Sequence, residues 1–155
     1  MEWLLRIYRP AKRRWSMLAF NFRDEIAGNA VIKRPRLTLR ITGDNADLEF
    51  YALLDSGADT SIIPLEFANL LGLKKGKEIR TSGVGGISAG YESSLNISLV
   101  GVNGITERIS SIPVYVLPTI NQFVIGRKKI FDLFKITFEQ YNNLILLSNQ
   151  EEITA

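Results

Sequence analysis

The triplet Asp55-Ser56-Gly57 stands between two apolar runs, residues 50–54 before it and Ile62-Ile63-Pro64 after it. Short apolar runs of this kind predict β-strands, so the triplet is expected on a tight turn that joins two strands. A carboxylate in apolar surroundings costs free energy, or it takes up a proton and becomes neutral. We therefore expect Asp55 to be compensated, and the sequence favours a second, identical carboxylate across a two-fold axis.

The composition removes many catalytic mechanisms. The 155 residues include no histidine and no cysteine, which excludes Ser-His-Asp and Cys-His triads as well as disulfide bonds. Zinc sites built from histidine and cysteine are excluded too, and we expect neither a metal nor a cofactor. Acid–base chemistry must then come from Asp, Glu, Lys or Tyr side chains.

The formal net charge of +3 is unevenly distributed along the chain. Basic residues gather in residues 1–14, whereas the remainder carries nearly equal numbers of acidic and basic side chains. No basic groove is predicted in this remainder, so no nucleic-acid partner is expected.

We divide the chain into a basic, aromatic N-terminal extension, residues 1–30, and a domain, residues 31–150. Two interpretations of the extension remain open. It is an added edge strand or a mobile arm, or else residues 1–14 make peripheral contact with an anionic membrane. A cytoplasmic location is expected, because neither a signal peptide nor a run of about 18 apolar residues is seen.

Most of the domain predicts short strands, because apolar and polar residues alternate and Asn103-Gly104 is a typical hairpin turn. The expected strands cover residues 37–42, 48–54, 62–64, 94–99, 112–117, 123–125, 136–138 and 144–147. Helices are expected between Pro64 and Gly72 and over residues 128–134. The expected core phenylalanines are Phe123, Phe131, Phe134 and Phe138. The fold class is therefore mainly β, a closed or folded-over barrel with one or two short helices.

Three segments resemble the retropepsin-like aspartic proteases, which are the single-lobe, retroviral type. Residues 53–64 resemble the active-site loop of that family, and the glycine-rich residues 83–86 resemble its flap. Residues 124–127, Val-Ile-Gly-Arg before a short predicted helix, resemble its second signature. The resemblance spans roughly residues 35–147 and implies a β-barrel of the acid protease type.

The resemblance implies an aspartic endopeptidase whose catalytic residues are Asp55, Ser56 and Gly57. Asp55 is expected to supply one of two carboxylates that share a proton at a dimer axis. One carboxylate then activates water, and the other polarises the peptide carbonyl. The Ser56 hydroxyl is expected to brace the two loops, and Gly57 to let backbone approach the carboxylates.

The resemblance also implies where a peptide substrate binds. The expected substrate-binding residues are Asp59, Val84, Gly85, Gly86 and Ile87. Gly126 and Arg127 are expected to support the site, and an ion pair between Arg127 and Asp59 is compatible with a purely structural role as well. Apolar subsites are expected from Ile62, Val84, Ile87 and Ile125.

A chain with a single Asp-Ser-Gly triplet must dimerise to bring two carboxylates together, so we expect a homodimer that acts on a peptide or protein. Residues 144–147 and part of the N-terminal region are the expected subunit interface. An alternative from a different class stays open: the same fold serves as a dimerisation or peptide-binding module with little or no hydrolysis.

Overall fold

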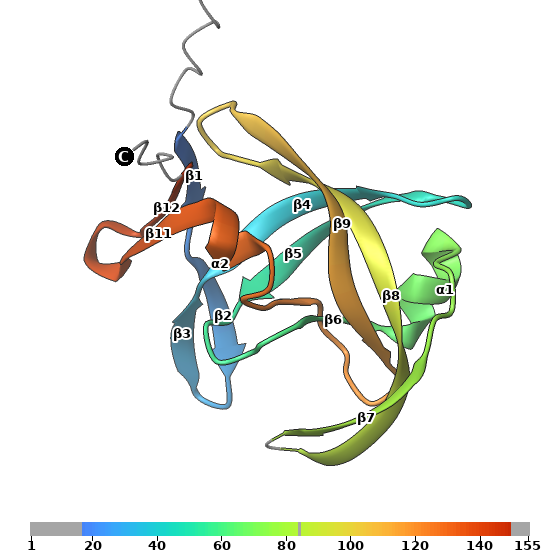
Figure 1. Cartoon of the computed structure of the whole chain (residues 1–155). Coiled ribbons are helices and arrows are strands. Elements are labelled where there is room, and N and C mark those ends of the chain that lie inside the picture. Colours follow the sequence, from blue (N-terminus) through green and yellow to red (C-terminus); the bar gives the residue numbers. More distant parts are fainter. Residues whose placement is uncertain (1–16, 84, 150–155) are drawn as a thin grey trace, which may run out of the picture.

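The computed structural model describes residues 17–83 and 85–149, and most of them lie in β-strands (Figure 1). The strands are β1 (Met17–Asn21), β2 (Arg23–Ala27), β3 (Ala30–Arg34), β4 (Arg36–Thr42), β5 (Asp47–Leu54), β6 (Ser61–Pro64), β7 (Glu78–Gly83), β8 (Gly86–Val100), β9 (Thr106–Leu117), β10 (Val124–Ile125), β11 (Phe134–Glu139) and β12 (Leu144–Asn149). The helices are α1 (Leu65–Leu71) and α2 (Ile130–Leu133), and a 3-10 turn covers Gln140–Asn142. The mainly β fold class with two short helices is confirmed.

Seven strands form one sheet in the order β4-β5-β10-β6-β9-β8-β7. β4 also pairs with β8, with Leu39 opposite Leu99, so this sheet folds back on itself. β10 runs parallel to β5 and antiparallel to β6, and it therefore joins the two strands that flank residues 55–60. Figure 1 shows β7 and the start of β8 as a hairpin that projects beyond the part of β8 paired with β9.

The two helices agree only in part with the helices predicted from the sequence. α1 follows Pro64 and ends at Gly72, whose φ of 72° is left-handed, as expected for a glycine after a helix. α2 is shorter than the predicted helix over residues 128–134, because Lys129 has a φ of 71° and cannot belong to a right-handed helix. Within residues 17–83 and 85–149, neither helix is long and apolar enough to cross a membrane.

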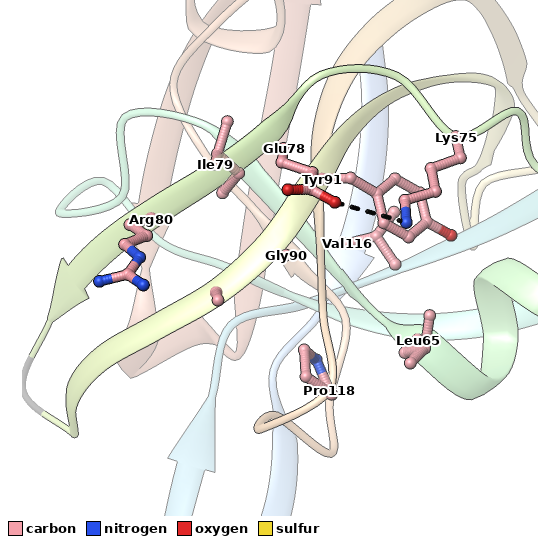
Figure 2. Close-up of a pocket in the computed structure, with 10 residues that line it drawn as sticks. Leu65, Lys75, Glu78, Ile79, Arg80, Gly90, Tyr91, Val116 and Pro118 are labelled. Atoms are coloured by element: carbon pink, nitrogen blue, oxygen red, sulfur yellow. Dashed lines mark ion pairs between the residues drawn. The ribbon is translucent and has the colours of Figure 1, made fainter.

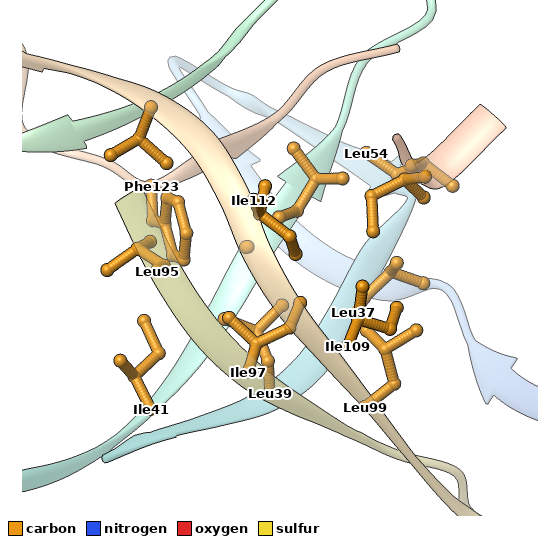
Figure 3. Packing of buried hydrophobic residues seen from close by; sticks show 14 of the residues in the cluster. Leu37, Leu39, Ile41, Leu54, Leu95, Ile97, Leu99, Ile109, Ile112 and Phe123 are labelled. Atoms are coloured by element: carbon orange, nitrogen blue, oxygen red, sulfur yellow. The ribbon is translucent and has the colours of Figure 1, made fainter. Parts of the chain in front are cut away.

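Alternating apolar residues of the folded sheet form the core. Figure 3 shows side chains from β4, β8 and β9 meeting there: Leu37, Leu39, Ile41, Leu95, Ile97, Leu99, Ile109 and Ile112. Phe123 and Phe134 are buried as predicted, and Phe131 is partly buried against the core. Phe138 is 45% exposed, so its predicted place in the core is wrong. It lies on β11, an edge strand, where neighbours cover it from one side only.

A second sheet has the order β1-β12-β11. β12, which contains residues 144–147, lies at its centre and pairs with strands of the same chain on both sides. Both edges of β12 are thus occupied within the chain, and the subunit contact expected at these residues stays a prediction. The outer edge of β1 is also covered, because the Asn103 side chain accepts from the Ala19 N–H (3.3 Å) and donates to the Met17 carbonyl (2.7 Å).

Part of the predicted N-terminal extension belongs to the folded body. Leu18 and Phe20 of β1 are almost completely buried in the core, at 0% and 1% exposure. The predicted boundary after residue 30 falls inside the hairpin of β2 and β3. Residues 1–14, with their expected membrane contact, lie outside the described residues.

Candidate active site

The Asp55 loop is held by the strand that precedes it and by β10. β5 ends at Leu54, and the next amide, that of Asp55, donates to the Ile125 carbonyl (2.9 Å). The Gly57 N–H donates to Asp55 Oδ1 (2.8 Å) and closes a tight turn around the carboxylate. Asp55 is half-buried, and Ser56 and Gly57 are exposed. The carboxylate is therefore less enclosed in one chain than its apolar flanks predicted.

Two glycines allow backbone segments to approach closely here. At Gly57 an added Cβ would lie 3.1 Å from Asp55 Oδ1, the oxygen that the Gly57 N–H binds. At Gly126 an added Cβ would lie 2.6 Å from the carbonyl carbon of Thr60 and 2.8 Å from the carbonyl oxygen of Ala58. Because backbone atoms cannot turn aside as a flexible side chain can, only glycine fits at position 126. This contact agrees with the supporting role expected of Gly126.

Ser61 is a supporting residue that sequence reasoning missed. Its hydroxyl is fully buried and accepts a hydrogen bond from the Gly126 N–H (3.0 Å). A buried polar group needs such a partner, so a serine at the start of the apolar run Ile62-Ile63 was a signal for this contact.

Arg127 binds the Asp55 loop at three points. Its guanidinium forms an ion pair with the Asp59 carboxylate, as expected, and Nη1 donates to the Ser56 carbonyl (2.9 Å). Its backbone N–H donates to the Ala58 carbonyl (2.8 Å). The Arg127 and Asp59 side chains are 50% and 76% exposed, so solvent screens the ion pair.

A cleft of about 910 Å³ opens at Asp55. Its walls come from the Asp55 loop, the β7–β8 hairpin, β9 and the segment before and within α2: Asp55, Gly57, Ala58, Asp59, Thr60, Ile62, Thr81, Ser82, Gly83, Tyr115, Arg127, Lys128 and Asp132. Sequence reasoning missed Thr81, Ser82, Tyr115, Lys128 and Asp132 as lining residues. Tyr115 reaches the cleft because parallel pairing of β6 with β9 places it opposite Ile62.

A smaller cavity of about 310 Å³ lies beneath the tip of the β7–β8 hairpin. It shares Ile62 and residues 81–83 with the larger cleft, and its apolar lining includes Ile87, Leu117 and Ile120. Gly85 and Gly86 also line it, and Gly86 has a φ of 100° that favours glycine.

The four residues expected to form apolar subsites have different positions. Ile62 and Ile87 line the cavity beneath the hairpin tip. Ile125 is fully buried in the core and lines neither hollow, so it forms no subsite. Val84 lies outside the described residues.

A separate hollow of about 570 Å³ lies against the base of the β7–β8 hairpin (Figure 2). Figure 2 shows Lys75 beside the Tyr91 ring, with its ammonium 3.8 Å from a Glu78 carboxylate oxygen. Burial raises the pKa of the Tyr91 hydroxyl above its ordinary value of 10.0, so this hydroxyl stays protonated at neutral pH. The residues that line this hollow are not shared with the cleft at Asp55.

The cleft contains three aspartates in different electrostatic settings. Asp59 pairs with Arg127, and the Asp132 carboxylate accepts a hydrogen bond from the Lys129 N–H (3.1 Å). Asp55 has no ion-pair partner among the residues that the structure describes. Asp132 has no ion-pair partner among these residues either, so what distinguishes Asp55 is its position on the glycine turn that β10 and Arg127 hold.

Comparison with protein families finds a match, described as retroviral aspartyl protease, over residues 32–134. The chain belongs to the retroviral aspartyl protease family. The part of the chain shared with other retroviral aspartyl proteases includes the Asp55 loop, the β7–β8 hairpin and Arg127, so the resemblance seen in the sequence is confirmed. β1 and β2 lie outside it.

Several solved structures are similar to this chain, and the first one described here shares its fold. A retropepsin-like aspartic protease from Rickettsia conorii is 16% identical, with a TM-score of 0.55 over 89% of this chain and 96% of that chain. EIAV protease in complex with an inhibitor is 27% identical, with a TM-score of 0.46 over 70% of this chain and 94% of that chain. The retroviral protease-like domain of Ddi1 from Leishmania major is 16% identical, with a TM-score of 0.46 over 80% and 99%. Comparison with curated proteins finds no match.

Proposed function

We propose that this chain is an aspartic endopeptidase that works as a homodimer, with Asp55 of each subunit at the catalytic centre. The observation that carries the proposal is the setting of the Asp55 carboxylate. It lies in a cleft, has no ion-pair partner among the described residues, and stands on a loop that Arg127 and β10 hold in place. Membership of an aspartyl protease family supports the same reaction.

The reaction follows from two carboxylates at a two-fold axis. At a separation of about 3 Å, two Asp55 side chains cannot both be ionised, so they hold one proton between them. The ionised carboxylate takes a proton from a water molecule, and the water oxygen adds to the carbonyl carbon of the peptide bond. The protonated carboxylate meanwhile donates to the carbonyl oxygen. The carboxyl group that took the water proton then donates it to the amide nitrogen, and the C–N bond cleaves. The other carboxylate takes a hydroxyl proton from the intermediate, which releases a carboxylic acid and an amine and restores the single shared proton.

The rest of the loop keeps the carboxylate in position for this reaction. The Gly57 N–H donates a hydrogen bond to one Asp55 carboxylate oxygen (2.8 Å), and the Arg127 guanidinium donates one to the carbonyl of the neighbouring residue Ser56. Small displacements of reacting groups cost large factors in rate, so these contacts matter more to catalysis than their modest stabilising energies indicate.

The β7–β8 hairpin is the proposed flap over the substrate. Gly85 and Gly86 at its tip offer backbone N–H groups to peptide carbonyls, and Ile87 provides an apolar contact. Asp59 lines the same cleft, and its carboxylate is the proposed contact for the substrate main chain. Because the cleft and the apolar cavity beneath the tip share lining residues, an extended peptide fits along both. Closure of the hairpin would exclude water from the reacting bond.

The test is hydrolysis of a peptide library by the purified full chain, read by mass spectrometry. Asp55→Asn is expected to lower the rate by about 100-fold or more, because it removes the acid–base group. Asp132→Asn is the matched control, since it changes another cleft carboxylate by the same single atom. Sedimentation of each variant shows whether the dimer persists.

The proposal is supported if Asp55→Asn still forms the dimer but no longer hydrolyses peptides, while Asp132→Asn hydrolyses them as before. A wild-type dimer that cleaves no member of the library identifies the chain as a binding or dimerisation module instead. Full activity in Asp55→Asn would show that the hydrolysis has another source.

A further inference from the structure

The geometry points to the β2–β3 hairpin as part of the subunit contact. We propose that a second copy of this chain packs against the outward face of this hairpin, at Ile26 and Val31. The inference rests on the proposed function, because the homodimer is what brings two Asp55 loops together. Ile26 and Val31 lie outside the part of the chain that matches the protease family.

The hairpin has two faces of different character. Paired residues of antiparallel strands share a face, so Ile26 and Val31 lie together with the ion pair of Asp24 and Lys33 (3.2 Å). The opposite face carries Glu25, which binds Arg36 of the body, and on the first face Lys33 Nζ also donates to Asn143 Oδ1 (3.4 Å), so the outward surface is the part around Ile26 and Val31. Ile26 and Val31 are 83% and 68% exposed. This exposure is unexpected, because a two-stranded hairpin has few other apolar residues that it could bury instead.

The hairpin is firmly attached rather than free to move. Glu25 receives two hydrogen bonds from the Arg36 guanidinium, from Nε (2.6 Å) and from Nη2 (3.0 Å), and only 12% of the Arg36 side chain is exposed. The Arg23 guanidinium lies over the Tyr51 ring at 3.7 Å from its centroid. An isolated two-stranded hairpin is barely stable in water, so these contacts hold it in place. A partner that binds a pre-ordered hairpin loses little conformational entropy.

The attachment lies directly beside the Asp55 loop. Pro35 joins β3 to β4, and its carbonyl accepts a hydrogen bond from the N–H of Leu54, the residue before Asp55 (2.8 Å). The base of the hairpin is therefore one strand spacing, about 5 Å, from the chain that leads into Asp55. Figure 1 shows the hairpin on the same side of the molecule as the connection from β5 to β6.

A two-fold axis through paired Asp55 carboxylates thus runs close to the hairpin base. Each strand of the hairpin has five residues and extends about 17 Å, which is enough to reach well into the neighbouring subunit. Phe138, which contacts Phe22 just before β2, adds an aromatic side chain that is 45% exposed. An apolar surface of this kind, beside the axis, marks a protein contact.

The charges on the outward face favour a second copy as the occupant. In a two-fold contact the same patch meets itself, so a patch must complement its own charges. Asp24 and Lys33 offer one charge of each sign beside the apolar pair, and their side chains are 61% and 41% exposed. An anionic membrane would instead require an excess of basic side chains on this face.

The test compares two double variants of the full chain. Ile26→Lys with Val31→Lys places charges on the proposed contact. Leu70→Lys with Val102→Lys makes the same change at sites that are 56% and 59% exposed, on α1 and after β8. The dimer dissociation constant is measured by sedimentation equilibrium, and circular dichroism checks the fold. Ile26→Ser with Val31→Ser is a milder pair for the case in which lysines prevent folding.

We expect the hairpin variants to weaken the dimer about tenfold or more, with no change in the control pair. Peptide hydrolysis, where present, then falls at low protein concentration and recovers at high concentration. Hairpin variants that dimerise like the wild type, or a wild-type chain that is monomeric at every concentration, overturn the inference. Sedimentation does not depend on hydrolysis, so a dimer that needs the hairpin but cleaves nothing counts only against the proposed function.

Discussion

Replacing Arg127 by methionine removes both side-chain contacts that hold the Asp55 loop while keeping a similar unbranched chain. The guanidinium bond to the Ser56 carbonyl, at 2.9 Å, is expected to contribute about 1 kcal/mol. The exposed ion pair with Asp59 adds about 0.2–1 kcal/mol after solvent screening. The total of about 1–2 kcal/mol corresponds to a factor of about 5–30 in the population of the ordered loop.

The assay for this prediction uses peptide hydrolysis and thermal unfolding side by side. If the lost free energy stabilises the arrangement of the loop that is needed for the reaction, kcat/KM decreases about 5–30-fold. The melting temperature falls by only a few degrees, about 2–4 °C per kcal/mol. Asp59→Asn is the matched control, because it weakens the ion pair and leaves the bond from Arg127 to the Ser56 carbonyl intact. We expect it to lower the melting temperature less than Arg127→Met does, whereas its kcat/KM also reflects the proposed contact of Asp59 with the substrate.

Two results would refute this reasoning. An Arg127→Met variant as active as the wild type would show that the loop keeps its geometry without the guanidinium. A melting temperature that Asp59→Asn lowers as much as Arg127→Met would show that the ion pair, and not the bond to the Ser56 carbonyl, is the main contribution.

Two further changes test other parts of the structure. Gly126→Ala places a methyl group 2.6 Å from the backbone of Thr60, so we expect a loss of about 1–3 kcal/mol of unfolding free energy in urea titrations, and an unchanged midpoint would contradict the close packing. The hydrogen bonds and charge of Arg36, with the charges of Arg34 and Arg23, hold the pKa of Glu25 below its ordinary value of 4.5. The stabilisation by Glu25 is therefore present above pH 4.5, and it is lost as the pH falls through the lower pKa that Glu25 has in the folded state. We expect Glu25→Gln to lower the free energy of unfolding by about 0.5–1 kcal/mol at pH 7 and by almost nothing in strong acid. Thermal unfolding at a series of pH values measures both costs. An equal cost at both pH values would contradict this assignment.

Local patterns were sufficient to locate the parts of the candidate site that lie on one stretch of chain. The Asp55 loop, the glycine-rich tip at Gly85 and Gly86, and the segment ending in Arg127 were all predicted from the resemblance of short segments to a known family. The ion pair of Arg127 with Asp59 was predicted as well, although its additional bond to the Ser56 carbonyl was not. Turn and strand signals extend over only a few residues, so they can be recognised without knowledge of the rest of the fold.

Contacts between distant strands were not predictable in this way. Tyr115 lines the cleft because β6 and β9 pair in parallel, and no feature near Tyr115 in the sequence indicates that register. β1 belongs to the core through its pairing with β12, more than a hundred residues later in the chain. Lys129 shortened α2 through its left-handed backbone, a conformation that depends on packing rather than on helix propensity.

The sequence by itself determined the mainly β class, the family and the position of Asp55 on a glycine turn, because these depend on residue types close together in the chain. Only the tertiary structure decided that β12 is enclosed between β1 and β11, and that the β2–β3 hairpin is attached beside Asp55 with Ile26 and Val31 facing outward. The physical reason is that strand pairing and the choice of exposed face result from long-range burial. The alternation of apolar and polar side chains along one strand does not indicate which other strand pairs with it.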